Sequence, residues 1–121
     1  MSNNIVKFSH NWNGKLNNSA FTTIRRHNPQ KYKLGNTYRI ELEGKIKGDA
    51  ILTAMRIIRI DQLNDFICYL DTGYNTASAT TILQRMNKGV DIKTVLFDLC
   101  LMVYKLPEKR EPEAMQTKID L

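Results

Sequence analysis

The sequence feature that most constrains the fold is the alternation in "TYRIELEGKI", residues 37–46. Its apolar residues Tyr38, Ile40 and Leu42 fall on one side of an extended chain, and its charged residues fall on the other. The segment therefore predicts a strand with one buried side and one side in water. By contrast, "KTVLFDLCLMVYKL", residues 93–106, is apolar on both faces, which predicts a strand in the middle of the sheet.

Two more segments predict strands because β-branched and aromatic residues dominate them: residues 21–25 ("FTTIR") and residues 49–60 ("DAILTAMRIIRI"). The middle of the chain changes to helical spacing. It predicts a short helix over residues 61–71, broken near Asn64, and a second helix over residues 76–89. Strands, then helices, then one closing strand indicate a small α+β domain around a curled sheet or barrel.

Length and composition narrow the class of protein. We expect one domain over residues 1–106 and a flexible polar tail over residues 107–121, which are rich in charge and proline. No apolar stretch approaches the roughly 20 residues of a membrane span, and no export signal is recognisable. Cys68 and Cys100 lie among large apolar residues, so we expect buried free thiols and a cytoplasmic protein. The spacing of cysteines and histidines predicts no metal site, and nothing indicates a cofactor.

The positive charge is concentrated in the first half of the chain. Residues 1–60 carry eleven Lys/Arg and three Asp/Glu, a net +8, whereas residues 61–121 carry seven and nine, a net −2. Such asymmetry favours an anionic partner for the first half, with nucleic acid the leading candidate. General solubility is the alternative, and charge alone does not decide between the two.

One predicted strand carries side chains suited to a polar ligand. Alternate residues of a strand point the same way, so Thr23 and Arg25 share one face of "FTTIR". The hydroxyl can donate or accept a hydrogen bond, and the guanidinium offers a planar fork for phosphate or carbonyl oxygens. If that face lines a cavity, the pair can orient a ligand; if it faces water, it is an ordinary strand edge.

The order of the short motifs "FTTIRR", "YKLGNTYRIEL" and "GDAILTAMRIIRIDQLND" resembles the ASCH family, within the wider PUA-like group of folds. The resemblance covers about residues 5–106. It implies a small β-barrel of about five to six strands with two to three helices beside a cleft. It also implies binding of RNA or of nucleoside-like ligands.

Some bacterial members of that family are small amidohydrolases that deacetylate acetylcytidine, and the resemblance implies three catalytic positions. They use a lysine just before the Thr-Ile-Arg strand, the threonine of that strand, and a glutamate in the helical segment. Thr23 matches the threonine, but alanine or serine stands where the lysine is expected, and the nearest lysine is Lys15. The helical segment offers Asp71 in place of a clear glutamate. A threonine hydroxyl needs a neighbouring base, so catalysis by Thr23, Lys15 and Asp71 requires Lys15 to fold back toward the strand.

Basic residues around one tyrosine could contact a nucleic acid. Lys31, Lys33 and Arg39 could bind phosphates while the ring of Tyr32 stacks on a base, with Arg26 adding to the electrostatic approach. The alternative is a solvated loop with Tyr32 packed on the barrel.

Two other polar residues, His27 and Asp98, have simple structural interpretations. His27 follows the strand and, as an isolated histidine, is expected to be a bystander that at most touches a phosphate or a base edge. Asp98 interrupts the apolar closing strand. It could be a buried, hydrogen-bonded acid close to the cleft, but we expect water or a backbone amide to satisfy it near a barrel end.

Three hypotheses of function follow. The first is an ASCH-type domain that binds RNA or a modified nucleoside or nucleotide through a basic cleft. The second is an amidohydrolase that deacetylates an acetylcytidine-like nucleoside. The third is a small accessory protein whose basic face binds an acidic protein partner.

Overall fold

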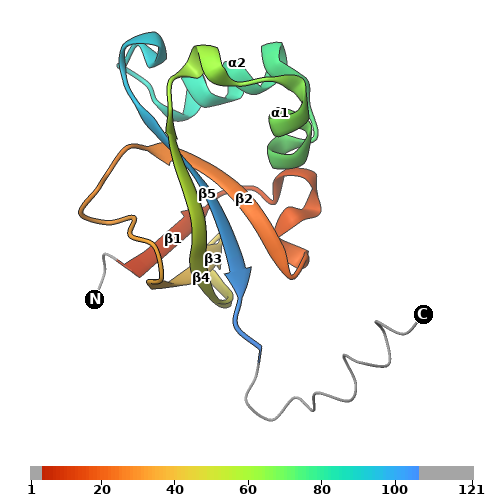
Figure 1. The fold of residues 1–121 in the computed structure, drawn as a ribbon. Helices are drawn as coiled ribbons and strands as arrows, with labels where there is room; N and C mark the ends of the chain where they lie inside the picture. Colours follow the sequence, from red (N-terminus) through yellow and green to blue (C-terminus); the bar gives the residue numbers. More distant parts are fainter. Residues whose placement is uncertain (1–3, 107–121) are drawn as a thin grey trace.

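The computed structural model describes residues 4–106, and the expected tail over residues 107–121 lies outside the described residues. Five strands and two α-helices follow one another along this part of the chain (Figure 1). None of its helices is long and apolar enough to cross a membrane. The strands are β1 (Ile5–Phe8), β2 (Ala20–Arg26), β3 (Thr37–Leu42), β4 (Lys45–Ile58) and β5 (Phe97–Tyr104).

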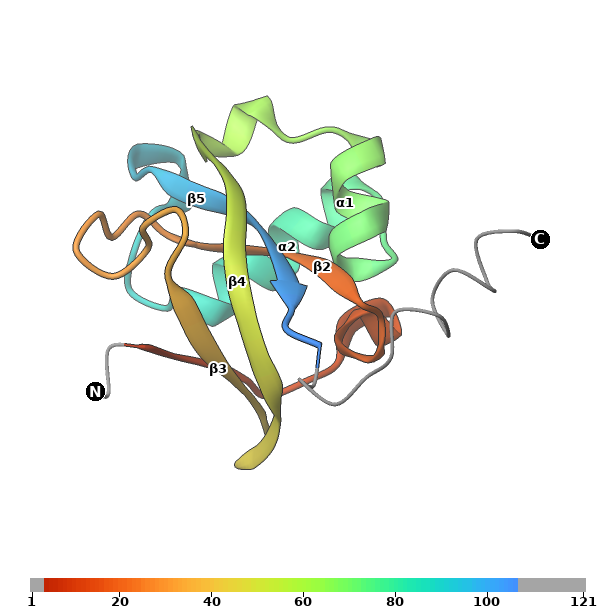
Figure 2. The same cartoon turned by 60° about the horizontal axis from the view of Figure 1, so that its bottom comes forward.

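The five strands form one mixed sheet in the order β1-β3-β4-β5-β2. β1 and β3 run parallel, and the other neighbours are antiparallel. The sheet curls into a half-barrel, with the long β4 crossing it from end to end (Figure 2). The predicted α+β class with a curled sheet is confirmed. The doubly apolar β5 lies between two other strands, as its pattern predicts.

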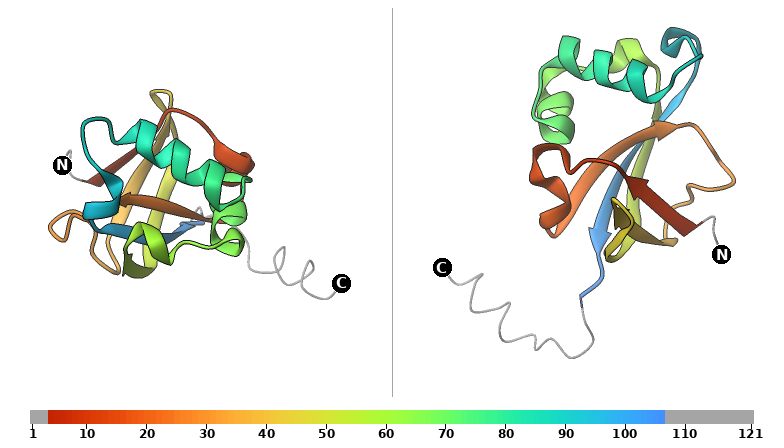
Figure 3. Two further views of the ribbon diagram at one scale, coloured as in Figure 1. Left: turned by 90° about the horizontal axis from the view of Figure 1, so that it is seen from above. Right: turned by 180° about the vertical axis from the view of Figure 1, so that it is seen from behind.

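The helices gather at one end of the sheet (Figure 3). α1 spans Asp65–Thr72 and α2 spans Thr76–Met86. The predicted break near Asn64 is real: a 3-10 turn, η3 (Ile60–Gln62), comes before it, and the Asn64 side chain caps α1 by accepting from the backbone N–H of Ile67. Two further 3-10 segments are η2 (Trp12–Asn17) and η4 (Ile92–Thr94).

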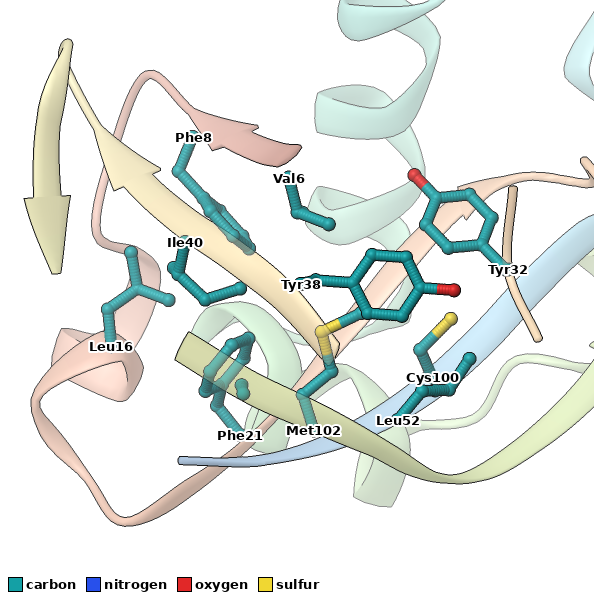
Figure 4. Packing of buried hydrophobic residues seen from close by; sticks show 11 residues of the cluster. Val6, Phe8, Leu16, Phe21, Tyr32, Tyr38, Ile40, Leu52, Cys100 and Met102 are labelled. Atoms are coloured by element: carbon teal, nitrogen blue, oxygen red, sulfur yellow. The ribbon is translucent and has the colours of Figure 1, made fainter. Parts of the chain in front are cut away.

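Buried apolar side chains form two clusters. The first fills the hollow of the sheet, and Tyr38, Ile40, Leu52 and Met102 are fully buried in it (Figure 4). The second joins the helices to the sheet through side chains such as Leu83 of α2. Both cysteines are free and buried, as expected, and burial raises the pKa of Cys100 to about 12.

The open side of the half-barrel lies between the edge strands β1 and β2. The guanidinium of Arg25 on β2 donates through Nη2 to the carbonyl of Lys7 on β1 at 2.9 Å. This hydrogen bond thus links two edges whose backbones are not paired. The space beside this link contains the candidate site.

Tyr38 should be a sensitive point of this fold. Its buried hydroxyl accepts from the backbone N–H of Lys33 and donates to the carbonyl of Lys31, which holds the β2–β3 connection. Tyr38→Phe leaves those two backbone groups without their partner, so the free energy of unfolding should fall by about 1–3 kcal/mol. Urea denaturation measures it. Tyr69→Phe, at a half-exposed ring, is the matched control and should change stability by less than about 0.5 kcal/mol.

Candidate functional site

Four of the side chains singled out in the sequence converge on one cavity. Lys15, Thr23, Arg25 and Asp71 all line a hollow of about 30 Å³ between the β1 and β2 edges and the helices. That volume admits about two water molecules, or the polar tip of a larger ligand. Phe8 and Leu83 supply apolar wall on either side.

Lys15 reaches the cavity because of the shape of η2. Asn13 and Gly14 both adopt left-handed backbone angles, with φ of 59° and 63°, which bends the segment. The side chain of Asn11 secures the bend by accepting from the backbone N–H of Leu16 at 2.8 Å. Lys15 is consequently turned inward and only 4 % exposed. Lys15 therefore folds back from the preceding loop, which is the condition that the sequence analysis set for catalysis.

Asp71 receives that lysine. Lys15 Nζ lies 2.9 Å from Asp71 Oδ1, and the hydroxyl of Thr22 donates to the same oxygen at 2.8 Å. Asp71 lies in the last turn of α1, which ends at Gly73 in a left-handed conformation. A side chain at Gly73 would press against Asn13, whose Nδ2 donates to the carbonyl of Tyr69. The close approach of η2 to the end of α1 thus aligns the ion pair.

Thr23 and Arg25 point to the same side of β2, as the alternation predicts. Thr23 is buried, and its Oγ1 accepts from Arg25 Nε at 3.0 Å. The guanidinium lies over the ring of Phe8 at 4.4 Å, within the range of a cation–π contact. The Thr23 hydroxyl keeps its own proton free for donation into the cavity.

Burial changes the acid–base character of the two cations. Burial, and more weakly the charge of Arg25, lowers the pKa of Lys15, although Asp71 acts in the opposite direction. Burial also lowers the pKa of Arg25. A lysine with a lowered pKa gives up its proton more readily than a free one, which is the property that a general base needs.

A larger basin opens beside the cavity. It measures about 450 Å³, within the usual range for ligand sites, and shares Arg25, Leu83 and Met86 with the cavity. Arg26 and Lys31 also line it, and its lining within the described residues includes no acidic residue. Burial, followed by the charges of Arg25 and Lys7, lowers the pKa of Lys31. The basin is therefore a region of uncompensated positive charge.

Three predicted contact residues have different surroundings from those the sequence suggested. Tyr32 is 5 % exposed and packs in the core with its ring centroid 6.0 Å from that of Tyr38, as the packing alternative describes (Figure 4). It also lines the basin, and its stacking on a base stays a prediction. Lys33 is exposed and lines neither the cavity nor the basin. Arg39 lies 3.5 Å from Asp49 at a separate surface hollow.

The sequence analysis missed two features. Thr22 alternates with Thr23 along β2, yet its hydroxyl also reaches the site by donating to Asp71. Asp98 is completely buried and pairs with His27, with Asp98 Oδ1 2.8 Å from His27 Nδ1. The sequence feature that pointed to Asp98 was an acidic residue within an apolar strand. The expected hydrogen bond from a backbone amide is also present: the N–H of Asn28 donates to Asp98 at 2.9 Å.

Comparisons with known proteins leave the family open. A scan against protein-family models, a search of curated proteins and a search of solved structures each found no match. Within residues 4–106, no three His, Cys, Asp or Glu side chains come close enough together to hold a metal ion.

The buried ion pair predicts strong energetic coupling. Lys15→Met leaves the Asp71 carboxylate buried without its partner and should lower the free energy of unfolding by about 3–5 kcal/mol. Adding Asp71→Asn should recover part of this loss, so the double variant loses less than the sum of the two single variants. Urea denaturation of the four proteins measures the coupling.

The exposed Arg39–Asp49 pair is the matched control for that cycle. Arg39→Gln and Asp49→Asn should show a coupling of at most about 1 kcal/mol. A Lys15–Asp71 coupling no larger than this would mean that the buried pair does not form in solution.

Proposed function

We propose that this protein binds a nucleotide unit of single-stranded RNA, or a modified nucleoside, in the cleft made by the cavity and the basin. The observation that carries the proposal is the position of Arg25, which lines both spaces and lies beside the Thr23 hydroxyl. The cleft would accept the polar edge of a base on one side and phosphate oxygens on the other. The resemblance to the ASCH family supports the same ligand class.

The cavity suits the edge of a base rather than a whole base. Its volume of about 30 Å³ fits a carbonyl or an amino group, and the surrounding groups can donate to or accept from either. The remainder of the base would lie at the mouth, where Met86 is 54 % exposed. Methionine is flexible enough to move aside for a flat ring.

The basin suits a phosphate. Arg25, Arg26 and Lys31 supply positive charge around a space without acidic lining residues in the described chain. Binding of a phosphate releases counterions from RNA, so the affinity should depend on salt. The uneven charge of the whole chain, a net +8 in residues 1–60, adds long-range attraction.

Salt dependence tests this proposal. Arg26→Gln and Lys31→Gln should each lower the steepness of log affinity against log salt by about 0.7 for single-stranded RNA. Fluorescence anisotropy with a labelled oligocytidine measures it. Lys45→Gln, at an exposed position at the start of β4, is the matched control and should leave the slope unchanged.

Slopes for the two basin variants equal to that of Lys45→Gln would mean that RNA binds elsewhere. No RNA binding, together with capture of a partner that survives nuclease treatment, would favour the accessory-protein hypothesis.

A second candidate, an amidohydrolase acting on an acetylated cytosine nucleoside, rests on the contact between Lys15 and Asp71. With the shared proton of the pair on Asp71, Lys15 would be a neutral amine; Thr23 would attack the acetyl carbonyl, and Lys15 would accept its proton and return it to the leaving amine. Arg25, whose Nε lies 3.0 Å from Thr23 Oγ1, would stabilise the negative charge that develops on the acetyl carbonyl oxygen. The cytosine amine would leave with a proton, and water would then release acetate. The cavity has room for a water between Lys15 and Thr23.

Incubation with acetylcytidine tests this candidate through the release of cytidine. If the protein turns over, Thr23→Val should reduce the rate by at least about 100-fold, because it removes the hydroxyl and keeps the shape of the side chain. Thr22→Val is the matched control, and it should reduce the rate far less because Lys15 still holds Asp71. No turnover above background in the unmodified protein would exclude the enzyme.

A further inference from the structure

The buried carboxylate of Asp98 has no role in the ligand binding proposed above. It is 0 % exposed and projects from β5, an inner strand of the sheet. One of its oxygens contacts His27 Nδ1 at 2.8 Å, and the other accepts from the backbone N–H of Asn28 at 2.9 Å. A carboxylate removed from water needs such partners, and a positive charge on His27 would compensate it best.

This contact orients the imidazole of His27. The ring is held through Nδ1, which leaves Nε2 as its free nitrogen. The His27 side chain is 27 % exposed and lines the basin beside Arg26 and Lys31. When the ring is charged, Nε2 is a donor aimed away from the carboxylate that holds it.

From this geometry we propose that the basin is an oxyanion site in which His27, held by Asp98, is a pH-dependent donor to the phosphate of a nucleotide. This inference rests on the proposed function for the identity of the nucleotide. The oxyanion site itself requires only the residues of the basin. Asp98 acts through His27 and is a positioning residue.

The charged and titratable groups around His27 come from β5, from β2 and from the β2–β3 connection, which also carries Tyr32; burial raises the pKa of the Tyr32 hydroxyl. Asp98 faces it from β5, and Arg25 and Arg26 line the basin from β2. Lys31 lines the basin from the β2–β3 connection. The basin residues of α2 are Leu83 and Met86, and Asn87 directly follows the helix; none of the three titrates. Imidazole is the side chain whose charge ordinarily changes between about pH 5 and pH 8, so an anion should bind more tightly at the acidic end.

Sulfate is the best probe because its charge is constant over this range, whereas a phosphate ester takes up a proton near about pH 6. Binding is followed by NMR through the His27 Cε1–H and Arg25 Nε–H signals. Sulfate should bind about tenfold more tightly at about pH 5 than at about pH 8, as expected for one added charge-assisted hydrogen bond.

Variants identify the group responsible. His27→Gln should abolish the pH dependence and leave the weaker affinity measured at high pH. Asp98→Asn, which keeps an oxygen but removes the charge, should move the loss of affinity to lower pH. The chain has two histidines, so His10→Gln is the matched control and should keep the profile of the unmodified protein. Sulfate binding without pH dependence, a dependence that persists in His27→Gln, or no shift of the His27 signal would overturn the inference.

A second arm separates this inference from the proposed function. Cytidine 5′-monophosphate and the diester CpC should both show the His27 pH dependence, whereas cytidine should show none. The ligand that binds more tightly identifies whether the site takes a terminal or an internal phosphate. If sulfate behaves as predicted but cytidine and RNA do not bind, the proposed function fails and the oxyanion site stands. If RNA binds while the His27 signals stay unchanged, the oxyanion site fails and the proposed function stands.

Discussion

The site depends on the buried ion pair between Lys15 and Asp71. Its two residues are 56 positions apart, and they join the irregular η2 segment to the last turn of α1. Because the Thr22 hydroxyl shares the same carboxylate oxygen, the pair also joins both segments to β2. A buried charge without its partner is strongly unfavourable, so the three elements hold one another in place. The cavity is the space that remains beside them.

The half-barrel explains why polar groups line part of this space. Its edge strands β1 and β2 face each other without pairing, so backbone groups there need other partners. Arg25 provides one by donating to the carbonyl of Lys7. The same guanidinium contacts Thr23 and lines the basin, so one group both links the edge strands and faces the proposed ligand site.

The cavity and the basin differ in electrostatic character, and this difference suggests a division of roles. In the cavity, Asp71 compensates Lys15, which suits a neutral polar group. In the basin, Arg25, Arg26 and Lys31 have no acidic neighbour among the lining residues described, and the charge of Asp98 is directed to His27 behind the surface. The proposed nucleotide ligand combines a neutral base with an anionic phosphate, and would match both.

The sequence by itself determined what depends on neighbours along the chain. Alternation with a period of two predicted the strands and the shared face of Thr23 and Arg25, and the doubly apolar pattern placed β5 inside the sheet. Tertiary structure alone decided which distant groups meet, including the pairing of His27 with Asp98 71 positions away and the burial of the Tyr32 ring. Those contacts depend on how edge strands, loop bends and helix ends come together in space. Local side-chain periodicity carries no information about that arrangement.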